Sequence, residues 1–194
     1  MIHITIDGFP LEVAENTTIL EAARSLNIHI PTLCYHPDQN VKANCRICVV
    51  EVEGARLLAP ACATPVTEGM VIKTNSAKVR QARRDVLELI LSRHNQDCLH
   101  CDRSGICELQ AVAEELHVNK GFRFPLDVRH GEKDTSSPSI VRDPSKCIIC
   151  GRCEYVCSEI QTVHALAKEK RGFETLYRPP FGRDLADTVC VNCG

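Results

Sequence analysis

Thirteen cysteines in 194 residues constrain this chain more than any other feature, and they fall into three groups. Their number is odd, so complete disulfide pairing would leave one thiol over. The opening Met-Ile-His-Ile-Thr-Ile lacks the basic head and apolar body of a secretory signal. We therefore expect a reducing, cytoplasmic location, where structural disulfides are rare. Metal ligation is the better interpretation, and the spacing within each group indicates the metal.

Charge and hydropathy exclude several classes of protein. The formal net charge of -2 argues against a broadly basic nucleic-acid binder. We therefore expect no nucleic-acid partner. No apolar run approaches the roughly 18 residues of a transmembrane helix, so we also expect no membrane span. Apolar residues, cysteine included, make up 44 % of the chain and aromatics 4 %. Because this share of apolar residues is small for a chain with several hydrophobic cores, metal sites are expected to help stabilise the fold.

Residues 1–75 are predicted to form a small α+β domain of the β-grasp type. Apolar and polar residues alternate over 2–6 and 11–13 on either side of an Asp-Gly turn, which predicts a β-hairpin. Thr18, with Glu21 three residues later, is typical of a capping box that opens a short helix, ending near Pro31. Further strands are expected at 49–52, 57–58 and 70–72.

The first group of cysteines lies on the loops of this domain and consists of Cys34, Cys45, Cys48 and Cys62. Four thiolates on a β-grasp domain suit a 2Fe-2S cluster. The loop over 35–46 could also point backbone N–H groups at the sulfurs. The alternative is a four-cysteine zinc site, since a Cys-x-x-Cys pair alone serves zinc equally well. A zinc ribbon would want two such pairs, whereas Cys34 and Cys62 are isolated.

Residues 76–135 are predicted to form a small helical domain around a second group. The periodicity over 76–93 indicates an amphipathic helix with a charged, solvated outer face that includes Arg83, and 107–118 indicates another short helix. The second group follows the first of these helices and consists of His94, Cys98, Cys101 and Cys107. These residues suit a 4Fe-4S cluster with one neutral imidazole ligand, which makes the cluster less negative and raises its potential. His100 is the competing histidine.

Residues 136–194 are predicted to form a bacterial-ferredoxin-like domain for two 4Fe-4S clusters. Cys147, Cys150, Cys153 and Cys157 are separated by two, two and three intervening residues, a run too compressed for the paired ligands of zinc fingers. In two-cluster ferredoxins the first three cysteines of such a run hold one cubane and the fourth holds the other. Gly151 would let the backbone approach the cluster, and Ser158 stands where that motif has proline.

A second ferredoxin run opens at Cys190 and Cys193. Two cubanes need eight thiolates and six are present here, so we expect the last ligands beyond residue 194 and a domain that is incomplete at its C-terminal end. With four cysteines in the first group, three in the second and six in the third, all thirteen are assigned.

The three groups in this order resemble the electron-entry region of a set of redox complexes. The set comprises the iron–sulfur subunit of NADH:quinone oxidoreductase, the small diaphorase subunit of NAD-reducing nickel–iron hydrogenases, some NAD-linked formate dehydrogenases, and the iron-only hydrogenases. Residues 136–160 look most like the iron-only (FeFe) hydrogenases, in particular the large subunit of the NAD-linked, electron-bifurcating type. The cysteine motifs of that family's hydrogen-activating domain are not among these 194 residues.

The resemblance implies an electron relay without a catalytic centre of its own. It implies one 2Fe-2S cluster, one His/Cys3 4Fe-4S cluster and up to two further 4Fe-4S clusters. The chain has no G-x-G-x-x-G loop, so NAD or flavin would bind to a partner chain. The implied partners are a flavin/NAD-binding iron–sulfur subunit and a small 2Fe-2S subunit, with ferredoxin as a further candidate. The other complexes of the set remain alternatives, and a zinc-stapled interaction module is the alternative of a different class.

Overall fold

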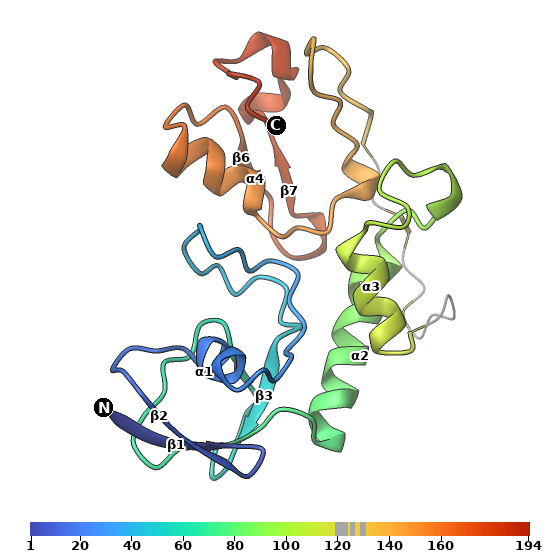
Figure 1. Cartoon of the computed structure of the whole chain (residues 1–194). Helices are drawn as coiled ribbons and strands as arrows, with labels where there is room; N and C mark the ends of the chain where they lie inside the picture. The colour runs from blue at the N-terminus through green and yellow to red at the C-terminus, as the bar shows by residue number, and fades with distance from the viewer. Residues whose placement is uncertain (119–123, 125–126, 129–130) are drawn as a thin grey trace.

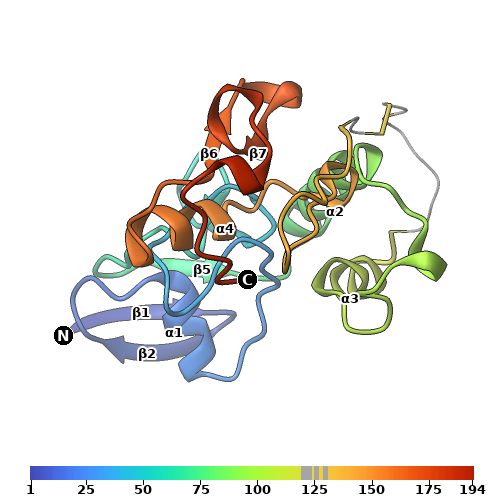
Figure 2. The ribbon, with the colours of Figure 1, turned by 90° about the horizontal axis from the view of Figure 1, so that it is seen from above.

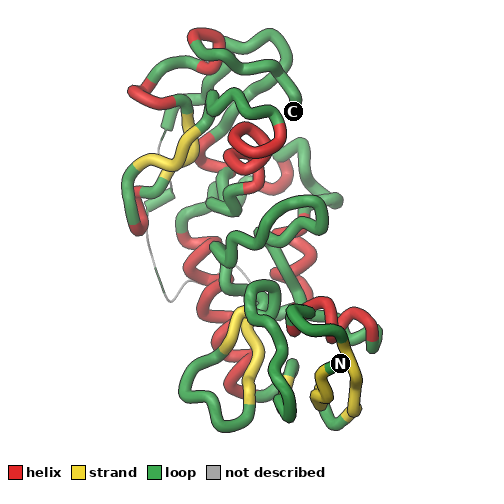
Figure 3. The backbone as a smooth tube through the Cα atoms, turned by 90° about the vertical axis from the view of Figure 1, so that its left-hand side faces the viewer, coloured by secondary structure: helices red, strands yellow, loops and turns green. Residues whose placement is uncertain are grey.

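The computed structural model of the chain describes residues 1–118, 124, 127–128 and 131–194. A sheet and a short helix lie at the N-terminal end, two helices run beside them, and a loop-rich C-terminal region lies at the opposite end (Figure 1). Loops and turns, green in Figure 3, make up much of the chain. The predicted α+β class is confirmed. None of the described helices is long and apolar enough to cross a bilayer.

The N-terminal sheet is mixed and has the strand order β2-β1-β5-β3-β4. The predicted hairpin is formed by β1 (Ile2–Ile6) and β2 (Phe9–Val13). Asp7 and Gly8 both have positive φ, as a two-residue type I′ turn requires. β5 (Val71–Lys73) pairs parallel to β1, and β3 (Val49–Val52) pairs antiparallel to β5. The prediction of a strand at 57–58 is wrong, because Leu57 is exposed and the edge strand β4 is Ala59–Pro60.

Helix α1 (Ile19–Ser25) begins at the predicted capping box and ends earlier than predicted. The Thr18 hydroxyl accepts from the backbone N–H of Glu21, and the Glu21 carboxylate accepts from the backbone N–H of Thr18 at 2.8 Å. At the other end Asn27 takes a left-handed φ of 57°, and the N–H of Ile28 donates to the Ala23 carbonyl. This Schellman arrangement satisfies the last carbonyls and stops the helix before Pro31.

Two hydrophobic cores hold residues 1–118. The first core lies between α1 and the sheet. The second core joins the loop over 33–47 to helices α2 (Ala77–Ser92) and α3 (Glu108–Glu115). It therefore crosses the predicted boundary between residues 75 and 76. Its fully buried side chains are Leu33, Ile47 and Leu87.

The charged face of α2 is less solvated than the sequence predicts. Arg83, expected on the outer face, is only 5 % exposed and donates to the Val49 carbonyl of β3 at 2.9 Å. Arg84 donates to the Leu116 carbonyl beyond α3. Arg83 and Arg84 thus donate to carbonyls of neighbouring elements, and of the two only Arg83 is buried.

The C-terminal region contains short elements only. Helix α4 (Arg152–Tyr155) continues into a π-helical turn over Val156–Ile160, and β6 (Ala167–Glu169) pairs antiparallel with β7 (Leu176–Arg178). Short 3₁₀ turns stand between and around these elements. Seen from above, α4 lies over the N-terminal part of the chain (Figure 2). The predicted boundary at residue 135 follows a segment that lies partly outside the described residues.

Candidate metal centres

The four cysteines of the first group are buried and lie in two pairs. The backbone N–H of Cys45 donates to the Cys34 sulfur at 3.5 Å. A hydrogen bond from the Cys45 thiol also lowers the pKa of Cys34 to about 6, and one from the Cys62 thiol lowers the pKa of Cys48 to about 7. Each pair therefore readily holds one thiolate. Two pairs of sulfurs match the needs of a two-iron cluster, which takes two protein ligands on each iron.

The first group also joins the two cores. Cys48 and Cys62 belong to the first core, between α1 and the sheet. Cys34 and Cys45 belong to the second core, against α2 and α3. A group bound by all four sulfurs would consequently be held by both halves of residues 1–118.

All four residues of the second group line one cavity of about 500 Å³. His94 stands just after the end of α2, Cys98 begins a 3₁₀ turn, and Cys107 is the N-cap of α3. The Nδ1 atom of His94 is fully buried. The cavity is many times the roughly 30 Å³ share of one water molecule. It has room for a polyatomic inorganic group, and its sulfur and imidazole donors suit iron.

His100, the competing histidine, points away from this cavity. Its side chain is 82 % exposed, and its Nδ1 lies 2.8 Å from a carboxylate oxygen of Asp97. It does not line the cavity that His94 shares with the three cysteines. Of the two histidines, His94 is the one that the fold brings to the cysteines of the second group.

The third group is spread over α4 and the turns around it. Cys150 packs against the second core, and burial raises the pKa of its thiol. Cys157 is buried in the π-helical turn, where its sulfur accepts from the N–H groups of Ala165 at 3.1 Å and Leu166 at 3.3 Å. Such amide donors stabilise a thiolate and tune a bound cluster. The remaining members of the group are Cys147, Cys153, Cys190 and Cys193.

Within the described residues, no three His, Cys, Asp or Glu side chains meet at the spacing of a single metal ion. The three groups nevertheless approach one another at the second core. Cys107 and Cys150 pack against this core, which contains Cys34 and Cys45. A negative charge on Cys34 contributes to the raised pKa of Cys150, after the larger effect of burial.

Sequence reasoning missed the residues that bring the groups together. The Asn44 side chain donates to the Cys150 carbonyl at 3.2 Å and to the Tyr177 hydroxyl at 3.4 Å. Gly151 has a φ of +76°, and a Cβ there would lie 2.9 Å from the Asn44 side chain and from the Tyr177 hydroxyl. The glycine therefore permits close approach to the loop of the first group, whereas the sequence predicts an approach to a cluster. The one available signal was its position between two cysteines of a tight run.

Two family models match this chain. Residues 1–77 match the 2Fe-2S iron-sulfur cluster binding domain. Residues 83–121 match the NADH-ubiquinone oxidoreductase-G iron-sulfur binding region. The two matches contain the first and the second group of candidate ligands.

Several known proteins are similar over the whole chain. The NADP-reducing hydrogenase subunit HndD of Solidesulfovibrio fructosivorans is 52 % identical over an alignment of 199 positions, which covers 100 % of this chain and 34 % of the relative. One subunit of the NADH-quinone oxidoreductase of Rhizobium meliloti is 39 % identical over 100 % of this chain and 23 % of its own length. The chain thus spans about a third or less of these relatives.

A solved structure supports the same likeness. A chain in the crystal structure of an NAD+-reducing [NiFe]-hydrogenase in the H2-reduced state superimposes with a TM-score of 0.89 at 30 % identity. The match covers 97 % of this chain and 80 % of that chain.

Proposed function

Because this chain belongs to the family of iron–sulfur subunits of NAD(P)-linked hydrogenases and NADH–ubiquinone oxidoreductases, we propose that it is the electron relay of a multisubunit, NAD-linked hydrogenase. It contains a 2Fe-2S cluster domain followed by a 4Fe-4S-binding region. The observation that carries the proposal is the cavity shared by His94 and the three cysteines of the second group. The residues of the three groups would hold the clusters, which would supply one-electron chemistry when bound.

The ligands of the proposal follow the three groups. Cys34 and Cys45 would hold one iron of the 2Fe-2S cluster, and Cys48 and Cys62 would hold the other, as their pairing favours. The second cluster would take the four residues of the cavity. The six cysteines of the third group would supply six of the eight thiolates that two cubanes need.

The hydrogenase assignment is favoured over its alternatives by similarity. Identity is 52 % to the hydrogenase subunit, against 39 % to the quinone-linked subunit. In a hydrogenase, a flavin/NAD-binding iron–sulfur subunit and a small 2Fe-2S subunit would exchange electrons with this chain, and a hydrogen-activating site would lie at the other end of the path. The electron-bifurcating type, with ferredoxin as an additional partner, is the most specific form of the proposal.

The first site is tested by removing one of its four candidate ligands. Cys48→Ala removes one of two ligands on one iron, so the EPR signal of the reduced 2Fe-2S cluster should disappear while the 4Fe-4S signals remain. Iron and sulfide are counted on the anaerobically purified protein. A colourless wild-type protein that contains zinc and no sulfide would establish the interaction module instead.

The second site is tested through its histidine. In His94→Cys a thiolate replaces a neutral imidazole, so the cluster should stay bound and its midpoint potential should fall. The matched control is His100→Cys, which changes an exposed histidine outside the cavity. EPR-monitored redox titration gives both potentials. A fall in the control rather than in His94→Cys would assign the ligand to His100.

A further inference from the structure

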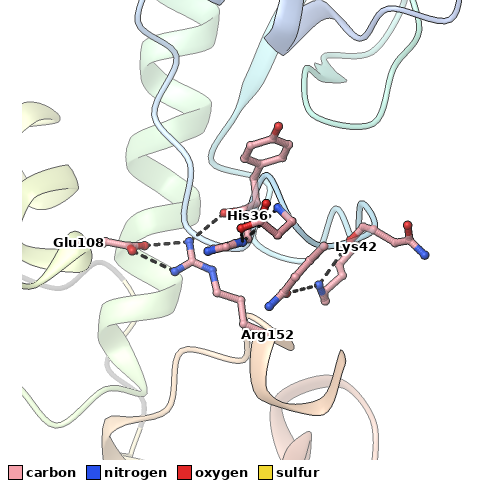
Figure 4. Close-up of polar contacts among 8 residues, drawn as sticks. His36, Lys42, Glu108 and Arg152 are labelled. Atoms are coloured by element: carbon pink, nitrogen blue, oxygen red, sulfur yellow. Dashed lines mark hydrogen bonds and ion pairs between the residues drawn. The ribbon is translucent and has the colours of Figure 1, made fainter. Parts of the chain in front are cut away.

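One arginine, Arg152, lies within the cysteine run of the third group and contacts a residue next to a cysteine of each of the other two groups. Arg152 stands between Cys150 and Cys153. Its Nη1 atom donates to one carboxylate oxygen of Glu108 at 2.9 Å, and its Nη2 atom forms an ion pair with the other at 2.9 Å. Nη2 also donates to the Tyr35 carbonyl at 2.9 Å. Figure 4 shows the side chain reaching from the C-terminal region to Glu108 and to the loop that carries His36 and Lys42.

The contacts of Arg152 meet the cluster-binding loops directly beside their candidate ligands. Tyr35 follows Cys34 of the first group, and Glu108 follows Cys107 of the second group. The three segments are separated by more than forty residues of sequence at each step, since the contacts span 44 and 117 residues. One planar cation therefore links all three groups through the immediate neighbours of their ligands.

The chemistry of this link requires arginine. A guanidinium offers five donors in a fixed fork, so it can bind a carboxylate through two nitrogens and still serve a carbonyl. The arginine side chain is 26 % exposed, which places the pair between a surface ion pair and a buried one. A lysine would keep the charge but could not hold both partners in one geometry.

Other contacts keep the same surfaces together. Asn44 reaches the Cys150 carbonyl, and the Lys42 ammonium lies 4.2 Å from the centre of the Tyr155 ring in α4. Cys107 and Cys150 both pack against the second core, which includes Cys34. Arg152 thus lies at a closely packed junction and not on a free surface.

We infer that Arg152 is a positioning residue that fixes the three cluster-binding loops relative to one another and keeps a positive charge between them. The inference rests on the proposed function, because it concerns loops that bind clusters. Reduction adds negative charge to a cluster, and a nearby cation stabilises the reduced form. Arg152 balances the Glu108 carboxylate beside Cys107, so its loss would leave that negative charge uncompensated and lower the potentials of the nearest clusters, besides freeing their loops.

The two parts of this role are separated by two substitutions and a control. Arg152→Lys keeps the charge and loses the fork, while Arg152→Met loses both. Arg178→Met is the matched control, because Arg178 pairs with Glu169 inside the β6–β7 hairpin and contacts neither of the other groups. All are made in the anaerobically purified, iron-loaded protein, with iron and sulfide counted first.

Three readouts decide the outcome. Midpoint potentials of the EPR signals should fall in Arg152→Met and stay near the wild-type values in Arg152→Lys. Both variants should weaken the enhancement of 2Fe-2S spin relaxation by neighbouring reduced clusters. In both variants the backbone amides of residues 35–45 should exchange hydrogen about tenfold faster than in the wild-type protein. Arg178→Met should leave all three readouts unchanged.

The inference is overturned if Arg152→Met keeps wild-type potentials, relaxation and exchange. Should Arg152→Met lose iron, Glu108→Gln provides the comparison, since it keeps the guanidinium and removes only the ion pair. That variant should then show the faster exchange and weaker relaxation, and a wild-type result for it would equally refute the inference. A wild-type protein without iron or sulfide would instead refute the proposed function.

Discussion

Replacing Gly151 with alanine tests whether the third group is pressed against the loop of the first group. Two costs follow from the structure. An alanine at φ +76° adopts a left-handed conformation at about 1–2 kcal/mol. Its Cβ would lie 2.9 Å from both the Asn44 side chain and the Tyr177 hydroxyl, and relieving such overpacking costs about 1–3 kcal/mol. The expected total is about 2–5 kcal/mol.

Gly182 provides the matched control for this prediction. It also has a positive φ, +68°, but nothing lies within 4 Å of a Cβ built there. Gly182→Ala should therefore cost only the backbone strain of about 1–2 kcal/mol. The difference between the two variants, about 1–3 kcal/mol, isolates the crowding against Asn44 and Tyr177.

Native-state hydrogen exchange on the iron-loaded protein measures both costs locally. Amides over 144–160 report opening of α4 and of the segment before it. Since 1.4 kcal/mol is a factor of ten, Gly151→Ala should exchange these amides about 5- to 150-fold faster than the Gly182→Ala protein. Equal exchange rates in the two variants would show that α4 is not pressed against the loop, and would refute the reasoning.

Two further predictions concern the cores and the helix start. Leu87 is fully buried in the second core, so Leu87→Ala should lower the free energy of unfolding by about 2–5 kcal/mol. Leu57→Ala, at an exposed position, should change it by less than about 0.5 kcal/mol; urea denaturation compares the two, and a similar effect in both would contradict the placement of the core. Thr18→Ala removes the cap of α1 and should cost about 1 kcal/mol, whereas Thr18→Ser should retain most of it. Unchanged urea midpoints in both Thr18 variants would mean that the capping box is not stabilising.

Local patterns were sufficient for much of the N-terminal fold. The Asp-Gly turn and the capping box were predictable because each satisfies its own backbone within a few residues. The strand at 57–58 was mispredicted from two leucines, because strand pairing depends on a partner elsewhere. In the structure Val50 pairs with Ala59, and no short-range pattern marks that register.

The candidate ligands were also visible in the sequence, since cluster binding imposes fixed cysteine spacings. The contacts between groups were not visible. Arg83 looked like a solvated residue of an amphipathic helix, and no pattern singled out Arg152. Their partners, Val49 and Tyr35, are 34 and 117 residues away. Only the folded chain brings these partners together, so helical periodicity and motif spacing carry no trace of them.

The division of the first group between two cores has a consequence for the order of assembly. The pair in the first core can be placed once the sheet and α1 have formed. The other pair is enclosed only when α2 and α3 pack against it, and α3 ends at Glu115. A 2Fe-2S site formed by all four cysteines would therefore be complete only after α3 has been synthesised, well after Cys62, the last cysteine of the group. Iron bound by all four sulfurs would keep the two cores from unfolding independently, because metal binding energy would become folding energy for both.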